Sequence, residues 1–147
     1  RLTPAGDVYH GGTFAGHPLS MAAGVATLRA LTAHPPYERL ERLGGRLVEG
    51  LVRAATRSDL PVQINRLGSM LTLFFSEEPV RQFAQASASR RDQFAAWALG
   101  LRQRGILVPP SPLEAIFLSA AHTEVQVDRC VDAVRAVFRS LRGQTPS

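Results

Sequence analysis

The stretch VQINRLGSMLTLFF, which runs from Val62 to Phe75, decides the fold class. Its first five residues alternate between apolar and polar side chains, whereas Met70–Phe75 is almost continuously apolar. Both patterns are typical of strands, the first half-buried and the second buried. Leu67, Gly68 and Ser69 lie between the two runs and are typical of a short turn. The stretch therefore predicts a β-hairpin.

Helical patterns lie on both sides of this hairpin. Before it, Tyr37–Arg57 places four leucines on one face and most of its arginines on others, which predicts an amphipathic helix over a core. We interpret Ser87–Arg91 as a mobile connection. Strands covered on one side by helices predict a two-layer α+β domain with a small, mostly antiparallel sheet. The elements predicted after that connection are a helix over Asp92–Arg104 ended by Gly105, a strand over Ile106–Val108, a strand over Ala115–Ala120, and a helix that Thr123 and Gln126 cap and that reaches about Leu141.

The first part of the chain stands apart from this unit. Pro18 suits the first position of a helix, and the pattern runs to about Thr32, where His34-Pro35-Pro36 stops it. This helix is rich in Ala and Gly, so we expect it to pack closely on a domain that this chain does not contain. The chain does not begin with Met and its first residues lack the apolar region of a signal peptide, so we expect a segment of a longer protein.

The composition excludes several classes of function. The 147 residues are 45% hydrophobic and 20% charged, as in a globular domain with a real core, and no apolar run reaches the roughly 20 residues of a membrane span. All 17 basic residues are arginines that lie singly except at Arg90-Arg91, which indicates solvated helix faces despite the net charge of +5. The single Cys130 excludes an internal disulfide and favours the cytoplasm, and its place on a helical pattern indicates a buried, inert thiol.

Two stretches could carry chemistry. Gly11, Gly12 and Thr13 precede the first helix, where glycine amides and a threonine hydroxyl could bind a phosphate, although a plain tight turn explains them as well. Glu114 lies between the turn PPSP and an apolar strand, where a carboxylate is either functional or solvated at the strand end. No metal site is predicted, because the four histidines, His10, His17, His34 and His122, have no metal-ligand spacing, and we assign them structural or solvent roles.

These same stretches resemble one family, the class III pyridoxal-phosphate enzymes. The resemblance is carried by VYHGGTFAGHPLSMAAG from Val8, INRLGSMLTLFF from Ile64 and RGILVPPSPLEAIFLSAAHTE from Arg104. The family has a G-T-x-x-G-N-P turn before an Ala-rich helix, then P-S-x-F-E-A and a strand that ends in A-H-S/T. The likeness covers essentially the whole chain in the family's order. The chain departs from the family at His17, where Asn is usual, at Leu113 in place of Phe, and at Ile116 in place of Gly.

The resemblance implies the C-terminal part of a fold-type I enzyme that works as a homodimer. Gly12 and Thr13 match the positions that bind the phosphate of pyridoxal 5'-phosphate across the dimer. Glu114 matches an acidic position that faces the active-site entrance and contacts the substrate's amino groups. Residues 1–34 would then end the large cofactor-binding domain, residues 35–142 would form the C-terminal α+β domain, and residues 143–147 would be a fraying tail.

The resemblance is strongest to the aminomutase branch of the family, which implies the conversion of glutamate-1-semialdehyde to 5-aminolevulinate for tetrapyrrole synthesis. Such enzymes hold the cofactor on a lysine as a Schiff base, and this chain has no lysine. The chain alone is therefore predicted to be inactive. Two alternatives remain, a part of a class III aminotransferase that acts on another amine, and a non-catalytic α+β module for dimerisation or binding.

Overall fold

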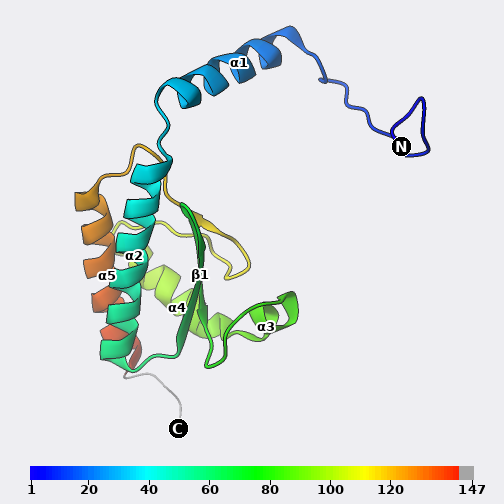
Figure 1. Cartoon of the computed structure of the whole chain (residues 1–147). Helices are drawn as coiled ribbons and strands as arrows, with labels where there is room; N and C mark the ends of the chain where they lie inside the picture. Colours follow the sequence, from blue (N-terminus) through cyan, green and yellow to red (C-terminus); the bar gives the residue numbers. More distant parts are fainter. Residues whose placement is uncertain (143–147) are drawn as a thin grey trace. The chain divides into compact units, whose positions relative to one another are not determined.

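The computed structural model describes residues 1–142 (Figure 1). The chain divides into two compact units, Arg1–Pro36 and the part from Tyr37 onward, and each is described here by itself. Residues 143–147, which the sequence predicts as a fraying tail, lie outside the described residues.

The second unit is a two-layer α+β domain, which confirms the predicted fold class. Its antiparallel sheet has three strands in the order β1-β2-β3, and helices cover one face of that sheet (Figure 1). The elements, in chain order, are α2 (Tyr37–Ser58), β1 (Val62–Leu67), β2 (Met70–Phe75), α3 (Phe83–Ala88), α4 (Arg91–Arg102), β3 (Ile116–Phe117) and α5 (Glu124–Arg142).

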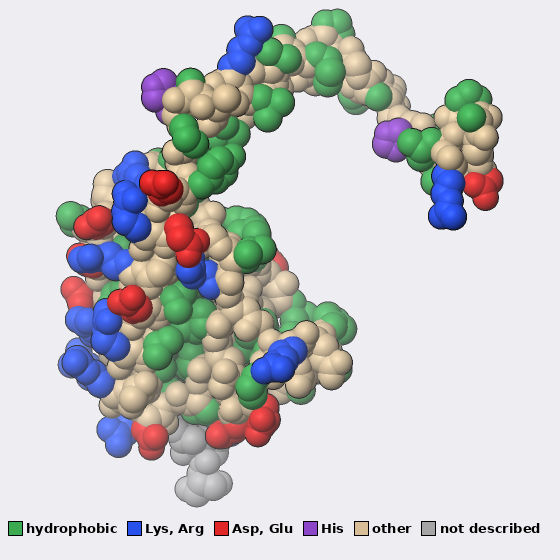
Figure 2. Space-filling view, viewed as in Figure 1, with side chains coloured by type: hydrophobic (Ala, Val, Ile, Leu, Met, Phe, Trp, Pro, Cys, Tyr) green, Lys and Arg blue, Asp and Glu red, His purple; other side chains and the backbone are tan. Residues whose placement is uncertain are grey.

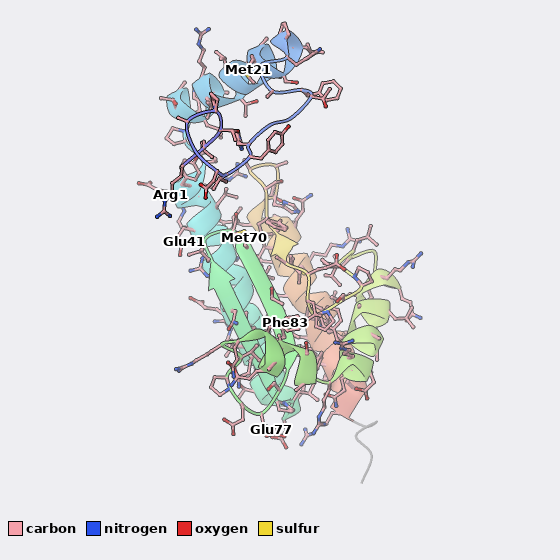
Figure 3. All side chains as sticks on the ribbon, turned by 90° about the vertical axis from the view of Figure 1, so that its right-hand side faces the viewer. Arg1, Met21, Glu41, Met70, Glu77 and Phe83 are labelled. Carbon is pink, nitrogen blue, oxygen red and sulfur yellow. The ribbon has the colours of Figure 1, made fainter. Side chains whose placement is uncertain are left out.

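The hairpin of β1 and β2 forms as the sequence predicts. Leu67 pairs with Met70 across a turn in which Gly68 has a φ of +58°, a conformation that glycine adopts without strain. Alternate residues of β2, Leu71, Leu73 and Phe75, are buried on the face that the helices cover. Figure 3 shows the hairpin end of the sheet at Met70 and the opposite end toward Glu77.

The core lies between this sheet and α2, α4 and α5. The apolar stripe of α5 is fully buried, and the ring of Phe138 meets that of Phe75 edge to face, with centroids 6.0 Å apart. Trp97 of α4 is 1% exposed and packs beside Phe94. The apolar face predicted for α2 is thus confirmed, and α4 and α5 likewise turn apolar side chains toward the sheet.

Helix ends follow the predicted capping signals. The side chain of Gln126 accepts a hydrogen bond from the Thr123 amide at 2.9 Å, and the Thr123 hydroxyl accepts one from the Gln126 amide at 3.3 Å. These two bonds form the capping box at the start of α5. After α4, Gly105 adopts a φ of +76°, and the amide of Ile106 closes the helix on the carbonyl of Leu101.

Three of the predicted elements differ from the structure. Ile106–Val108 is not a strand, because none of the described strands pairs with it. The strand predicted over Ala115–Ala120 is only two residues long, since β2 pairs with Ile116 and Phe117 and the chain turns soon afterwards. The stretch predicted as a connection at Ser87–Arg91 holds the end of α3 and the start of α4, and a capping box of Gln82 and Gln85 begins α3.

The first unit contains α1 (Pro18–Ala33), in agreement with the predicted helix. Pro18 occupies its first turn, and the hydrogen bond from the His34 amide to the Ala30 carbonyl ends it. Arg29 is its one charged residue, yet α1 has no buried residue. An apolar helix of this kind is normally buried against other protein. The large apolar side chains that α1 exposes are Leu19, Met21, Val25 and Leu28.

Candidate functional site

Gly12 and Thr13 lie in a short turn just before α1. The carbonyl of Gly12 accepts a hydrogen bond from the Ala15 amide at 2.9 Å, and Gly16 follows with a φ of +75°. Within residues 1–142, neither the amides of Gly12 and Thr13 nor the Thr13 hydroxyl makes a hydrogen bond. Exposed donors of this kind, gathered in one turn, suit an oxyanion such as a phosphate.

Space around Gly12 is also suited to a close ligand. A Cβ built at Gly12 would have no other atom within 4 Å, whereas one at Gly11 would lie 2.5 Å from the hydroxyl oxygen of Tyr9. Gly11 therefore serves the packing of the turn itself, and Gly12 leaves its backbone open to solvent. The close contact at Gly11 agrees with a tight turn, and the phosphate contact at Gly12 stays a prediction.

Glu114 closes a turn just before β3. Its amide donates a hydrogen bond to the Ser111 carbonyl at 3.2 Å, and the Leu113 amide donates one to the Ser111 hydroxyl at the same distance. The Glu114 side chain is exposed and makes no hydrogen bond or ion pair to the residues that the structure describes. Its carboxylate is thus free to meet a cation or an amine. Glu114 belongs to the second unit, whereas Gly12 and Thr13 belong to the first.

A polar cluster that the sequence does not predict lies at the start of α5. The Ser119 amide donates a hydrogen bond to Nδ1 of His122 at 3.0 Å, and the Ser119 hydroxyl lies 3.0 Å from the same atom. Arg39 of α2 donates to the carbonyls of Ala120 and His122 at 2.9 and 2.8 Å. The cluster binds this turn to α2, which agrees with the structural role predicted for His122. Only the Ser-x-x-His spacing hinted at it.

Nine of the 17 arginines belong to α2 and α5, and Figure 2 shows blue side chains gathered on the side of the second unit where these helices lie. Arg46 of α2 binds Asp128 of α5 through two hydrogen bonds of 2.6 and 2.8 Å, and these bonds hold the pKa of Asp128 below its usual value. Glu41 forms a similar ion pair with Arg66 near the hairpin end (Figure 3), which lowers the pKa of Glu41. These pairs join exposed faces of packed elements, so they are structural contacts of modest strength.

Cys130 has the character that the sequence predicts. It is a free, partly buried thiol, and burial raises its pKa to about 11, so it stays protonated at neutral pH and is a poor nucleophile. Within residues 1–142, no group of three or more metal-binding side chains comes together. No helix in this range combines the length and the apolar character needed to cross a membrane.

Comparison with known proteins identifies the family. The sequence matches the family Aminotransferase class-III over residues 1–136. The chain belongs to the class III aminotransferases. This class III chain is 46% identical to the glutamate-1-semialdehyde 2,1-aminomutase of Desulfosudis oleivorans over 96% of its length, and 45% identical to that of Rhodopirellula baltica over the same share. It spans about a third of each relative, 33% and 32%.

Two solved structures share the fold. An omega-transaminase from Sphaerobacter thermophilus matches 96% of this chain with a TM-score of 0.74 and 27% identity, and the match covers 33% of that enzyme. The FumI protein of Sphingopyxis sp. MTA144, solved as its PLP internal aldimine form, matches 92% of the chain with a TM-score of 0.70 and 29% identity, over 30% of that protein. Family membership therefore implies pyridoxal phosphate and a small-molecule substrate.

Proposed function

We propose that this chain is the C-terminal part of a pyridoxal-phosphate-dependent aminomutase. The whole protein would convert glutamate-1-semialdehyde to 5-aminolevulinate, as an isomerase of porphyrin biosynthesis in the cytoplasm. The observation that carries this proposal is the 45–46% identity to named glutamate-1-semialdehyde aminomutases along 96% of the chain. The omega-transaminase of Sphaerobacter thermophilus, which has the same fold, is only 27% identical, which favours the aminomutase over an aminotransferase for another amine.

The two enzymes differ in what they consume. An aminomutase moves the amino group within one substrate, whereas a transaminase needs a separate amine donor and releases its carbonyl product. We expect the whole protein that contains this chain to form 5-aminolevulinate from glutamate-1-semialdehyde without any added amine. The measurement is product formation in the presence and absence of a panel of ω-amines. Turnover that requires an added ω-amine would instead make the protein a transaminase, and no turnover with either would favour a non-catalytic module.

The turn at Gly12 and Thr13 fits the cofactor's phosphate. Two amides and one hydroxyl there have no partner among residues 1–142, and no Cβ at Gly12 obstructs an approaching group. These groups would bind the phosphate of a cofactor held by the partner subunit of a homodimer, and so would orient it. The cofactor, when bound, acts as an electron sink for the carbon that carries the amine. Its lysine must be supplied from outside this chain, which has none.

The proposal also assigns a role to Glu114 and to each part of the chain. The free carboxylate of Glu114 would bind the substrate's ammonium group at the entrance of the site. Residues 1–34 would end the large cofactor-binding domain, and residues 35–142 would form the C-terminal α+β domain. The exposed apolar residues of α1 support this division, because such a helix needs a protein neighbour.

Replacing Thr13 with valine is expected to weaken cofactor binding in the whole protein by about 10- to 150-fold. Valine keeps the shape of threonine but removes one hydrogen bond to a charged group, which is worth roughly 1.5–3 kcal/mol. The measurement is the dissociation constant for pyridoxal phosphate, from fluorescence or equilibrium dialysis.

The matched control is Thr27→Val on α1. The Thr27 hydroxyl bonds the Ala23 carbonyl of its own helix at 2.9 Å, so its loss should leave cofactor affinity unchanged. If the Thr13→Val variant and the parent bound the cofactor equally well, Thr13 would not bind the phosphate. That result would not bear on the aminomutase reaction itself.

A further inference from the structure

A cavity of about 410 Å³ lies in the second unit, between α5 and the segment Gly105–Val108 that follows α4. Its size falls within the range of small-molecule sites, roughly 300–1,000 Å³. None of the residues discussed for the cofactor or the substrate lines it. Its walls are mainly apolar and include Leu47, Ile106, Val108, Ile116, Leu118 and Val127.

The polar side chains of this cavity offer donors. Arg129 is its one charged lining residue and makes no hydrogen bond or ion pair within residues 1–142. The guanidinium group of Arg129 lies close to Gly105, another lining residue, because a Cβ built at Gly105 would be 3.8 Å from Nη2 of Arg129. A positively charged side chain beside apolar walls complements a ligand that has an anionic group and an apolar chain.

The other polar lining groups strengthen this donor character. Gln126 uses its Oε1 to accept from Thr123, and its Nε2 makes no hydrogen bond to the part of the chain that the structure describes, so it can donate to a ligand. Nδ1 of His122 accepts the Ser119 amide, so the neutral ring carries its proton on Nε2. The thiol of Cys130 completes the lining and stays protonated at neutral pH, because its pKa is raised to about 11.

We propose that this cavity binds a small amphipathic carboxylate, a molecule with one carboxylate group and a short apolar chain. The carboxylate would bind the guanidinium group of Arg129 and the Nε2 donors of Gln126 and His122, and the chain would lie against the aliphatic walls. The residues of this site differ from those proposed for the cofactor and the substrate. Carboxylate binding here can therefore be tested independently of the aminomutase reaction.

Octanoate, octanol and acetate are suitable probes, measured by calorimetry on the 147-residue chain. Octanoate should bind at least tenfold more tightly than octanol, which lacks the charge, and than acetate, which lacks the apolar chain. Octanoate should also slow the alkylation of Cys130, the one cysteine of the sequence, by N-ethylmaleimide at pH 8.5. Equal affinities for octanoate and octanol would overturn the proposal, and so would unchanged alkylation at saturating octanoate.

Variants of α5 locate the charge that binds. Arg129→Gln should weaken octanoate binding by about tenfold and leave octanol binding unchanged, because one charge-assisted contact is lost. Arg129→Lys keeps the charge and should lose only a few-fold. The matched control is Arg139→Gln, an exposed arginine of the same helix outside the cavity, which should bind octanoate like the parent. If Arg129→Gln and Arg139→Gln bind octanoate equally well, Arg129 does not recognise the carboxylate and the proposal is wrong.

Discussion

Replacing Phe138 with alanine is expected to lower the free energy of unfolding by about 3–5 kcal/mol, the usual cost of removing a fully buried phenylalanine. Phe138 is 0% exposed and its ring meets that of Phe75 edge to face, so the variant loses both apolar burial and an aromatic contact. The cavity that remains would lie between the sheet and α5, where backbone on both sides resists collapse. Urea unfolding followed by the fluorescence of Trp97, the one tryptophan, reports this unit directly.

Phe117→Ala is the matched control for this substitution. This substitution also removes a phenylalanine side chain from the second unit, but Phe117 is 61% exposed on β3. We expect its unfolding free energy to fall by less than about 1 kcal/mol, because little apolar surface returns to water. If the two variants lost similar stability, Phe138 would not be at the centre of the core.

Local signals explain why the hairpin and long helices could be predicted from the sequence. The β1–β2 pair depends on alternation, apolar runs and a two-residue turn, all within fourteen consecutive residues. Helix α5 depends on one apolar stripe and on the capping box of Thr123 and Gln126. Each of these features is encoded by residues that are neighbours in the chain, so no tertiary information was needed.

The errors lie where a distant partner decides the outcome. Ile106–Val108 has the composition of a strand, but composition cannot supply a hydrogen-bonded neighbour. The clamp of Arg39 on the carbonyls of Ala120 and His122 joins residues more than 80 positions apart, and nothing local to Arg39 marks it. The glycines predict the turn at Gly12 and Thr13, but whether its donors are paired depends on the rest of the fold, and within residues 1–142 they have no partner.

Replacing Gly50 with alanine is expected to destabilise the chain by about 2–3 kcal/mol, the upper part of the range for overpacked cores. A Cβ at Gly50 would lie 2.4 Å from Cγ2 of Val131, so α2 and α5 could no longer approach as closely. Val131 is buried and β-branched, and it therefore has few rotamers with which to move aside. This cost exceeds the roughly 1 kcal/mol that alanine gains over glycine in a helix.

Gly45→Ala on the same helix is the matched control, and its expected effect has the opposite sign. A Cβ at Gly45 would have no other atom within 4 Å, so only the gain in helix propensity remains, about 0.5–1 kcal/mol of stabilisation. Introducing Gly50→Ala into a Val131→Ala background tests the cause directly. With the valine methyl groups gone, the substitution at Gly50 should become neutral or stabilising. An undiminished loss in that background would mean that the cost arises from backbone contacts of α2 rather than from Val131.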